Sequence, residues 1–175
     1  MMWMALRHLV SVLLLPVTVT VVVPIWLARR NGLTFLEPAT PLEWAALAAG
    51  VLAFVVGLAL FAASLARFAG QGQGTLAPWD PPKRLVAVGP YRYVRNPMIS
   101  GVVFVLIGEA LLLRSAPHLL WAVTFALINL VFIAGFEEPQ LEGRFGDAYR
   151  TYCRHVPRLV PRRTPWEPEE TTDLR

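Results

Sequence analysis

Four apolar stretches dominate the pattern of hydrophobic and polar positions along the chain. Three of them run for at least twenty residues without a charged side chain, and the remaining one is shorter and holds a single acid, Glu109. About twenty apolar residues form a helix long enough to cross the ~30 Å hydrocarbon core of a bilayer. The stretches do not alternate as barrel strands do, so they predict an all-α integral membrane bundle with about four transmembrane helices, at residues 9–28, 44–66, 97–113 and 115–136.

After Pro139 the pattern changes to that of an amphipathic helix. Charged residues fall on one face, and the other face carries apolar residues at helical spacing: Leu141, Phe145, Ala148, Tyr149, Tyr152 and Val156. Such a helix could lie on the membrane surface or fold back as a lid, and the pattern leaves both open. The polar, proline-containing residues 164–175 predict a disordered tail behind a single domain over residues 1–163.

Small residues and prolines shape the predicted spans. Ala49, Ala53 and Gly57 recur every four positions in the second span, a spacing that lets helices approach closely. Packing within the bundle is a simpler interpretation of this spacing than a dimer interface. In the first span, Pro16 and Pro24 should bend the helix.

Basic residues set the expected orientation. The 175-residue chain is 55% hydrophobic and carries 16 Lys and Arg against 12 Asp and Glu. In so apolar a chain this excess marks the cytoplasmic side of a membrane protein rather than a nucleic-acid-binding surface. Thirteen of the 16 lie in the N-terminal segment, between the second and third spans, or after the fourth span. The positive-inside rule therefore predicts a multi-pass protein with both termini in the cytoplasm.

The cysteine, the histidines and the acid of the third span give little indication of chemistry. A single cysteine, Cys153, excludes an intramolecular disulfide, and the three scattered histidines lack metal-ligand spacing, so no metal site is expected. We expect Cys153 to make an ordinary apolar contact. Glu109 should lie near the outer interface, where it would snorkel or pair with Arg114 or His118.

Two cytoplasmic segments, residues 74–97 and 137–161, have the composition expected of a functional site rather than of plain linkers. Prolines and a glycine fix the path of the first segment, which delivers Tyr91 and Arg95 to the start of the third span. Pro97 suits the first turn of that helix, where its missing N–H costs nothing.

The second segment opens with two adjacent acids, Glu137 and Glu138. Carboxylates at a membrane boundary are costly unless they are paired or solvated. The third and fourth spans should form a tight hairpin, so we expect Arg95 and Asn96 to face these acids across one cleft. A purely structural salt bridge at the interface is the alternative.

These two segments resemble a known family. Residues 89–97, Gly-Pro-Tyr-Arg-Tyr-Val-Arg-Asn-Pro, are similar to the Gly-x-Tyr-x-x-x-Arg-His-Pro signature of isoprenylcysteine carboxyl methyltransferases and related phospholipid methyltransferase-like membrane enzymes. Residues 137–158 resemble the C-terminal block of the same family. The resemblance implies a membrane methyltransferase (a transferase) that uses S-adenosylmethionine, bound on the cytoplasmic side.

The resemblance also implies roles for particular residues. An arginine can clamp a carboxylate in a fork, a glutamate can accept from hydroxyls or an ammonium, and an aromatic face such as Tyr91 favours a cation. Carried over position by position, the implied catalytic residues are Arg95, Asn96 and Glu138, and the implied cofactor contacts are Lys83, Arg84, Leu85, Val86, Tyr91, Asn96, Pro97, Met98, Ile99 and Glu137.

Two positions depart from the family's pattern. Asn96 stands where the family usually has histidine, and an asparagine cannot titrate. Ile133 stands one turn before Glu137, where the prenylcysteine enzymes have an arginine for the substrate carboxylate. The expected acceptor is therefore lipophilic or membrane-partitioned, such as an amine, a thiol, a hydroxyl or a small apolar acid, rather than a prenylcysteine carboxylate.

Two other functions remain open from the sequence. Sterol-type membrane reductases have a similar proline-arginine signature and a similar C-terminal stretch but bind NADPH, and they typically have many more than four spans. A non-catalytic membrane protein could use the same cleft to bind a lipid head group.

Overall fold

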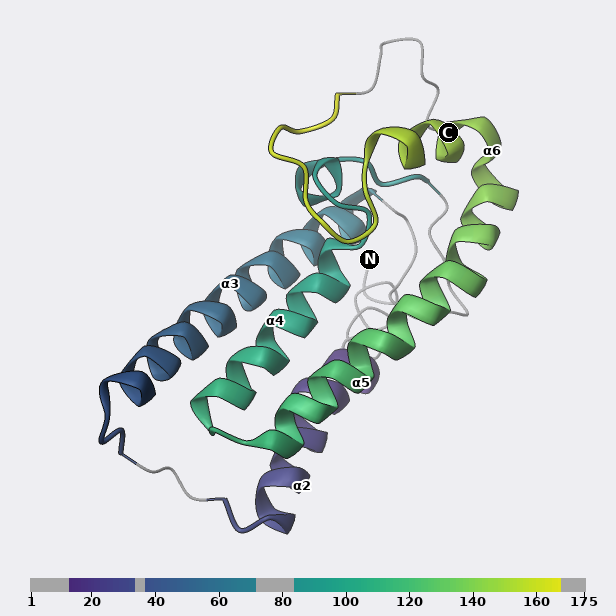
Figure 1. The fold of residues 1–175 in the computed structure, drawn as a ribbon. Coiled ribbons are helices and arrows are strands. Elements are labelled where there is room, and N and C mark those ends of the chain that lie inside the picture. Colours follow the sequence, from purple (N-terminus) through teal and green to yellow (C-terminus); the bar gives the residue numbers. More distant parts are fainter. Residues whose placement is uncertain (1–12, 34–36, 72–83, 168–175) are drawn as a thin grey trace. The chain divides into compact units, whose positions relative to one another are not determined.

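The computed structural model describes residues 13–33, 37–71 and 84–167. No strand occurs in these residues, which confirms the predicted all-α class. The helices, of which η1 and η3 are π-helical and η2 is a 3-10 turn, follow in this order (Figure 1): η1 (Leu13–Val22), α2 (Val23–Arg30), α3 (Pro41–Gln71), η2 (Gly89–Arg92), α4 (Pro97–Leu112), α5 (Ala116–Phe132), η3 (Ile133–Glu137) and α6 (Glu138–His155).

The chain divides into two compact units. The first comprises Met1–Ala59 and Gly101–Leu127, and the second comprises Leu60–Ser100 and Ile128–Arg175. All the described residues of the two segments that carry the family resemblance lie in the second unit.

Two helical stretches of the described chain, Pro41–Gly70 and Ala116–His155, are long and apolar enough to cross a membrane, and α4 is a shorter apolar helix. Only 11% of the most apolar part of each long stretch is buried inside the protein. Leu52 and Val131 are more than 60% exposed. Apolar side chains that face outward along a whole helix suit hydrocarbon rather than water, so these helices mark a membrane protein.

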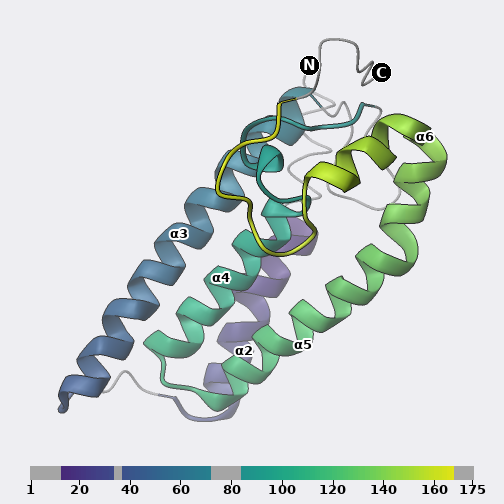
Figure 2. The same ribbon diagram turned by 45° about the horizontal axis from the view of Figure 1, so that its top comes forward.

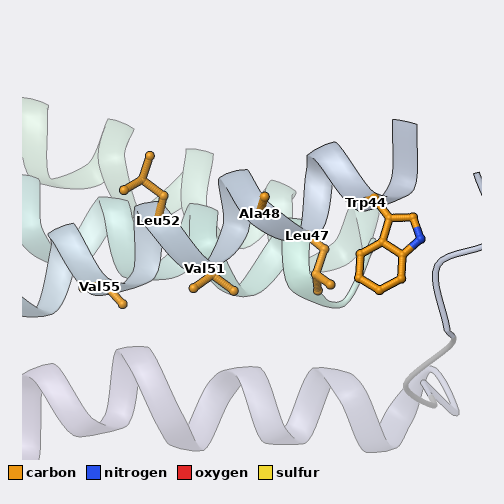
Figure 3. Close-up of a pocket in the computed structure, with 6 residues that line it drawn as sticks. All are labelled: Trp44, Leu47, Ala48, Val51, Leu52 and Val55. Atoms are coloured by element: carbon orange, nitrogen blue, oxygen red, sulfur yellow. The ribbon is translucent and has the colours of Figure 1, made fainter. Parts of the chain in front are cut away.

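The N-terminal half of α3 carries an exposed apolar face. An apolar groove of about 550 Å³ runs along it in the first unit, and the lining side chains are shown in Figure 3: Trp44, Leu47, Ala48, Val51, Leu52 and Val55. Trp44 lies one turn from the start of the helix, where an indole ring suits the boundary between hydrocarbon and water.

Glycines bring α3 and α4 into backbone contact in the first unit. A Cβ added to Gly57 would lie 2.7 Å from the carbonyl oxygen of Gly101 and 2.7 Å from the amide nitrogen of Val105, so only glycine fits. The expected packing role of Gly57 is confirmed. Ala49, however, is exposed, whereas Gly50 is buried against α4. The small residues at the contact are therefore seven apart rather than four, because a straight helix returns to the same face about every seven residues.

The prolines of the first predicted span lie where its helix is irregular. Pro16 is inside the π-helical segment η1, and Pro24 is in the first turn of α2. A proline removes one N–H and crowds the preceding turn, which disfavours a regular α-helix there. The hydroxyl of Thr20 donates to the carbonyl of Pro16 at 2.8 Å. The predicted start of this span, residues 9–12, lies outside the described residues.

A tight turn joins α4 to α5. The amide of Ser115 donates to the carbonyl of Ala110 at 3.0 Å and that of Arg114 to Leu111 at 3.2 Å, which is the Schellman pattern of a helix end. Arg114 takes the left-handed conformation, with φ 47°. Its guanidinium pairs at 2.9 Å with Glu43, which also accepts from two main-chain amides at the start of α3. This ion pair ties the turn to the start of α3.

The hydrogen bonds of His118 go to residues other than Glu109, although His118 is one of the two partners expected for that acid. His118 is 1% exposed and bonds the hydroxyl of Ser115 and the carbonyl of Pro24, at 2.7 and 3.1 Å. One carboxyl oxygen of Glu109 is buried without a hydrogen-bond partner among the described residues. His118 is therefore a structural residue whose two ring nitrogens are both bonded.

Candidate functional site

An aromatic core holds the second unit together. Apolar residues of α6 pack against the loop before α4 and against the chain after α6, and the buried members are Ala87, Phe145, Tyr149, Tyr152, Val156 and Trp166. The charged residues between them on α6, such as Asp147 and Arg154, are exposed. Within this unit the apolar face of α6 packs on the loop and is not exposed.

A glycine sets the direction of α6. At Gly146 the backbone has φ 53° and ψ −126°, and the helix changes direction there (Figure 2). Side chains with a Cβ rarely adopt this conformation, whereas glycine does so readily. Tyr149 and Tyr152 follow the bend, so the kink places the two aromatic side chains in the core.

Glu138 is bound by two arginines from different segments. Arg95 Nη1 donates to Oε1 of Glu138 at 2.9 Å. Arg158 Nε donates to the same oxygen at 2.9 Å, and its Nη2 bonds Oε2. The side chains of Arg95 and Glu138 are each only 14% exposed. Charges removed from water are expensive unless they are paired, so this cluster is favourable only when all three residues are in place.

The rest of Arg95 is also tied to α6 and its continuation. The amide of Arg95 donates to the carbonyl of Pro157 at 2.9 Å, and Nη1 donates to the sulfur of Cys153 at 2.9 Å. Cys153 is therefore a hydrogen-bond acceptor for a guanidinium and not only the apolar contact that we expected. Nε of Arg95 is buried with no hydrogen-bond partner among the described residues, which leaves one strong donor for a ligand.

A polar pocket of about 580 Å³ lies beside this cluster. Arg95, Glu138, Tyr149 and Cys153 contribute to its lining, together with exposed charged residues of α6. The pocket thus presents charges of both signs within a single unit.

Tyr91 and Glu137 form a second pair of neighbours. The Tyr91 side chain is buried, and its carbonyl accepts from the hydroxyl of Tyr152 at 2.8 Å. Burial raises the pKa of the Tyr91 hydroxyl, and the nearby charge of Glu137 raises it further. Tyr91 is therefore a neutral group with a carboxylate close by.

The remaining predicted residues lie on the loop and on the first turn of α4. Val86 and Pro97 are buried, Arg84 is exposed, and Leu85, Asn96, Met98 and Ile99 are half-buried. Asn96 directly precedes α4, and its carbonyl accepts from both the amide and the hydroxyl of Ser100. Lys83 lies outside the described residues. The structure thus pairs Arg95 with Glu138, sets Tyr91 near Glu137, and places the other described residues in the same unit.

The sequence analysis missed two features of this unit. Arg158 forks onto Glu138, although the sequence gives no sign of which arginine of the C-terminal segment does so. Trp166 lies in the predicted disordered tail, yet it is 7% exposed and its ring lies 5.7 Å from that of Tyr152. The one sign in the sequence that this part of the tail is ordered is a single tryptophan among prolines and charged residues. Residues 168–175 of that tail lie outside the described residues.

Comparison with known proteins identifies the family. A family model described as phospholipid methyltransferase matches residues 45–148, a segment that includes the 89–97 motif and both Glu137 and Glu138. The chain belongs to the phospholipid methyltransferase family. Family membership confirms the resemblance found in the sequence.

Individual relatives of this phospholipid methyltransferase family member match shorter segments. Methanethiol S-methyltransferase 2 of Bradyrhizobium diazoefficiens is 42% identical over 72 residues, which are 41% of this chain and 27% of the relative. Methanethiol S-methyltransferase of Mycobacterium tuberculosis is 41% identical over 71 residues, which are 41% of this chain and 28% of the relative. The aligned segments thus span little more than a quarter of these curated relatives. No solved structure matches the chain significantly.

Proposed function

We propose that this protein is an S-adenosylmethionine-dependent membrane methyltransferase whose cofactor is held by the second unit. The observation that carries the proposal is the pairing of the two motif segments. Arg95 of the 89–97 motif bonds Glu138 of the C-terminal block at 2.9 Å, inside the region that the family model matches. A purely structural salt bridge would not need the further polar groups that surround this pair.

The residues present fit the chemistry of the cofactor. S-adenosylmethionine carries a carboxylate, an ammonium, ribose hydroxyls and a sulfonium, and when bound it supplies an electrophilic methyl group. Glu137 can accept from the hydroxyls or the ammonium, and the ring of Tyr91 can lie against a cation. Nε of Arg95 is a buried donor without a hydrogen-bond partner among the described residues, so it can donate to an oxygen of the cofactor.

The contacts also divide the roles of the three implied catalytic residues. Both oxygens of Glu138 already accept from arginines, so Glu138 holds Arg95 in place rather than serving as a base. Arg95 supplies positive charge and a donor. Asn96 can bond a ligand but cannot remove a proton.

We propose four membrane spans near residues 9–28, 44–66, 97–113 and 115–136, with α6 as a cytoplasmic amphipathic helix. The distribution of basic residues supports cytoplasmic termini and a cytoplasmic site. Reporter fusions after residue 175 and within the loop at residues 31–40 should then label opposite sides of the membrane. Labelling on the same side would contradict the three spans that separate these two positions in the proposed topology.

The acceptor that we propose is a small or lipophilic nucleophile, with a thiol favoured. Ile133, one turn before Glu137, is an apolar residue at the position where a carboxylate acceptor would require a cation, and its side chain is buried. With no base at Asn96, an acceptor that loses its proton to water near neutral pH has an advantage. A thiol does so far more readily than an alcohol, and its thiolate is a strong nucleophile. The two curated relatives reported above are named for the methylation of a thiol, methanethiol.

Cofactor binding tests the proposal directly. Glu137→Gln removes a charge that should accept from the cofactor, so we expect S-adenosylmethionine affinity to fall by about 1.5–3 kcal/mol, roughly ten- to a hundredfold. Isothermal titration of the full chain in detergent micelles measures this. Glu37→Gln removes an exposed acid from the first unit and is the control with the same change of charge.

The same titration separates the competing functions. Binding of NADPH in place of S-adenosylmethionine would point to a reductase. A protein that binds neither nucleotide would be a non-catalytic one. Unchanged affinity in a folded Glu137→Gln variant would remove Glu137 from the site.

Transfer of a labelled methyl group tests the acceptor. We expect methylation of methanethiol or a longer alkyl thiol, and little of a prenylcysteine analogue in the same assay. The rate on the thiol should rise with pH toward the thiol's own pKa, because only the thiolate is a strong nucleophile. Efficient methylation of the prenylcysteine analogue alone would overturn the argument from Ile133.

A further inference from the structure

The chain after α6 runs back along the loop that precedes α4. We call residues 157–167 the C-terminal strap. Three main-chain hydrogen bonds join the strap to the loop in opposite chain directions: the Arg95 amide to the Pro157 carbonyl at 2.9 Å, the Arg162 amide to the Tyr93 carbonyl at 2.9 Å, and the Trp166 amide to the Arg92 carbonyl at 3.0 Å. In the described part of the loop, residues 84–96, the helix η2 is only four residues long, so the strap supplies main-chain hydrogen bonds that regular secondary structure does not.

Arg92 and Trp166 close the end of the strap. Nε of Arg92 donates to the Trp166 carbonyl at 2.7 Å, while the Trp166 amide donates back to the Arg92 carbonyl. The pair therefore exchanges two hydrogen bonds. A third contact joins Nη2 of Arg92 to Glu167 at 2.6 Å, but Glu167 is 79% exposed and adds little.

The indole of Trp166 reaches the residue that holds Tyr91. Its ring lies 5.7 Å from that of Tyr152 and is stacked on His155 at 5.7 Å. The hydroxyl of Tyr152 in turn donates to the carbonyl of Tyr91. Trp166 thus packs the side chain whose hydroxyl anchors the loop.

From these contacts we infer that Trp166 and Arg92 are positioning residues, which fix the loop so that Tyr91 and Asn96 hold their places in the site. This inference rests on the proposed function, because it takes those two residues to face the cofactor. The strap lies beyond residues 45–148, so the family match does not include it. Neither positioning residue needs to touch a ligand.

Substitution of Trp166 tests the inference with two measurements on the full chain. Trp166→Ala should raise amide hydrogen exchange at residues 91–95 by about tenfold or more. The Arg95 amide donates to the strap directly, and the carbonyls of Arg92 and Tyr93 accept from it, so loss of the strap contacts should let the loop open locally. It should also raise the KM for S-adenosylmethionine by about tenfold and change kcat less than about twofold. Trp166→Phe keeps an aromatic ring and should restore most of both values.

Two further variants keep the test decisive. Val160→Ala changes a strap residue that is 76% exposed, and it should behave as the unmodified protein. Arg92→Lys keeps the charge but cannot place the same N–H at the Trp166 carbonyl, so it should shift both measurements in the same direction as Trp166→Ala. If Trp166→Ala does not fold, Arg92→Lys tests the inference in its place.

The outcomes separate this inference from the proposed function. Unchanged exchange at residues 91–95 in both folded variants overturns the strap's role. Faster exchange with an unchanged KM also overturns it, because the strap would then serve stability alone. An unmodified protein that binds no S-adenosylmethionine overturns the proposed function, and the inference with it.

Discussion

The second unit depends on the ion pairs of one carboxylate, that of Glu138, whose side chain is 14% exposed. That carboxylate accepts from Arg95, which precedes α4, and from Arg158, which follows α6. Each of these charges is costly to remove from water alone, and the cost is recovered only when the three meet. The loop, α6 and the chain beyond it are therefore constrained to assemble together, and the site forms only when they do.

Irregular backbone at defined positions brings the partners of this carboxylate together. The π-helical η3 ends at Glu137, and such wide turns are frequent at functional sites because they shift the faces of the helix that follows. Gly146 then turns α6 so that its tyrosines pack on the loop. The carbonyl of Tyr91 and the amide of Arg95 are both bonded as a result. The chemistry of the site thus rests on two departures from a straight helix.

The sequence predicted features that depend on local pattern or on the cost of an isolated charge. Continuous apolar stretches predicted α3, α4 and α5, and Pro97 begins α4 as its missing N–H suggests. The expense of an unpaired acid at a membrane boundary suggested that Arg95 and Glu138 would meet.

Features that depend on distant contacts were not predictable in the same way. The tail from residue 164 has the composition of a disordered segment, yet the indole of Trp166 is buried and its amide donates to the Arg92 carbonyl. Nothing in the pattern selects Arg158 over its neighbouring arginines, and nothing around Gly146 distinguishes a kink from an ordinary helical glycine such as Gly143. The hydrogen bond from Arg95 to Cys153 likewise depends on how α6 packs.

A double-mutant cycle on Arg95 and Glu138 tests most directly whether their ion pair holds the second unit together. The free energy of unfolding in detergent micelles is compared for Arg95→Met, Glu138→Gln and the double variant. Arg95→Met removes one of the two arginines that bind Glu138, and Glu138→Gln leaves two half-buried guanidiniums without their counter-charge, so each single change should cost about 1.5–3 kcal/mol. The double variant should cost less than the sum by at least about 1 kcal/mol, because the second change removes the stranded charge. Costs that simply add would show that the two residues do not hold the unit together.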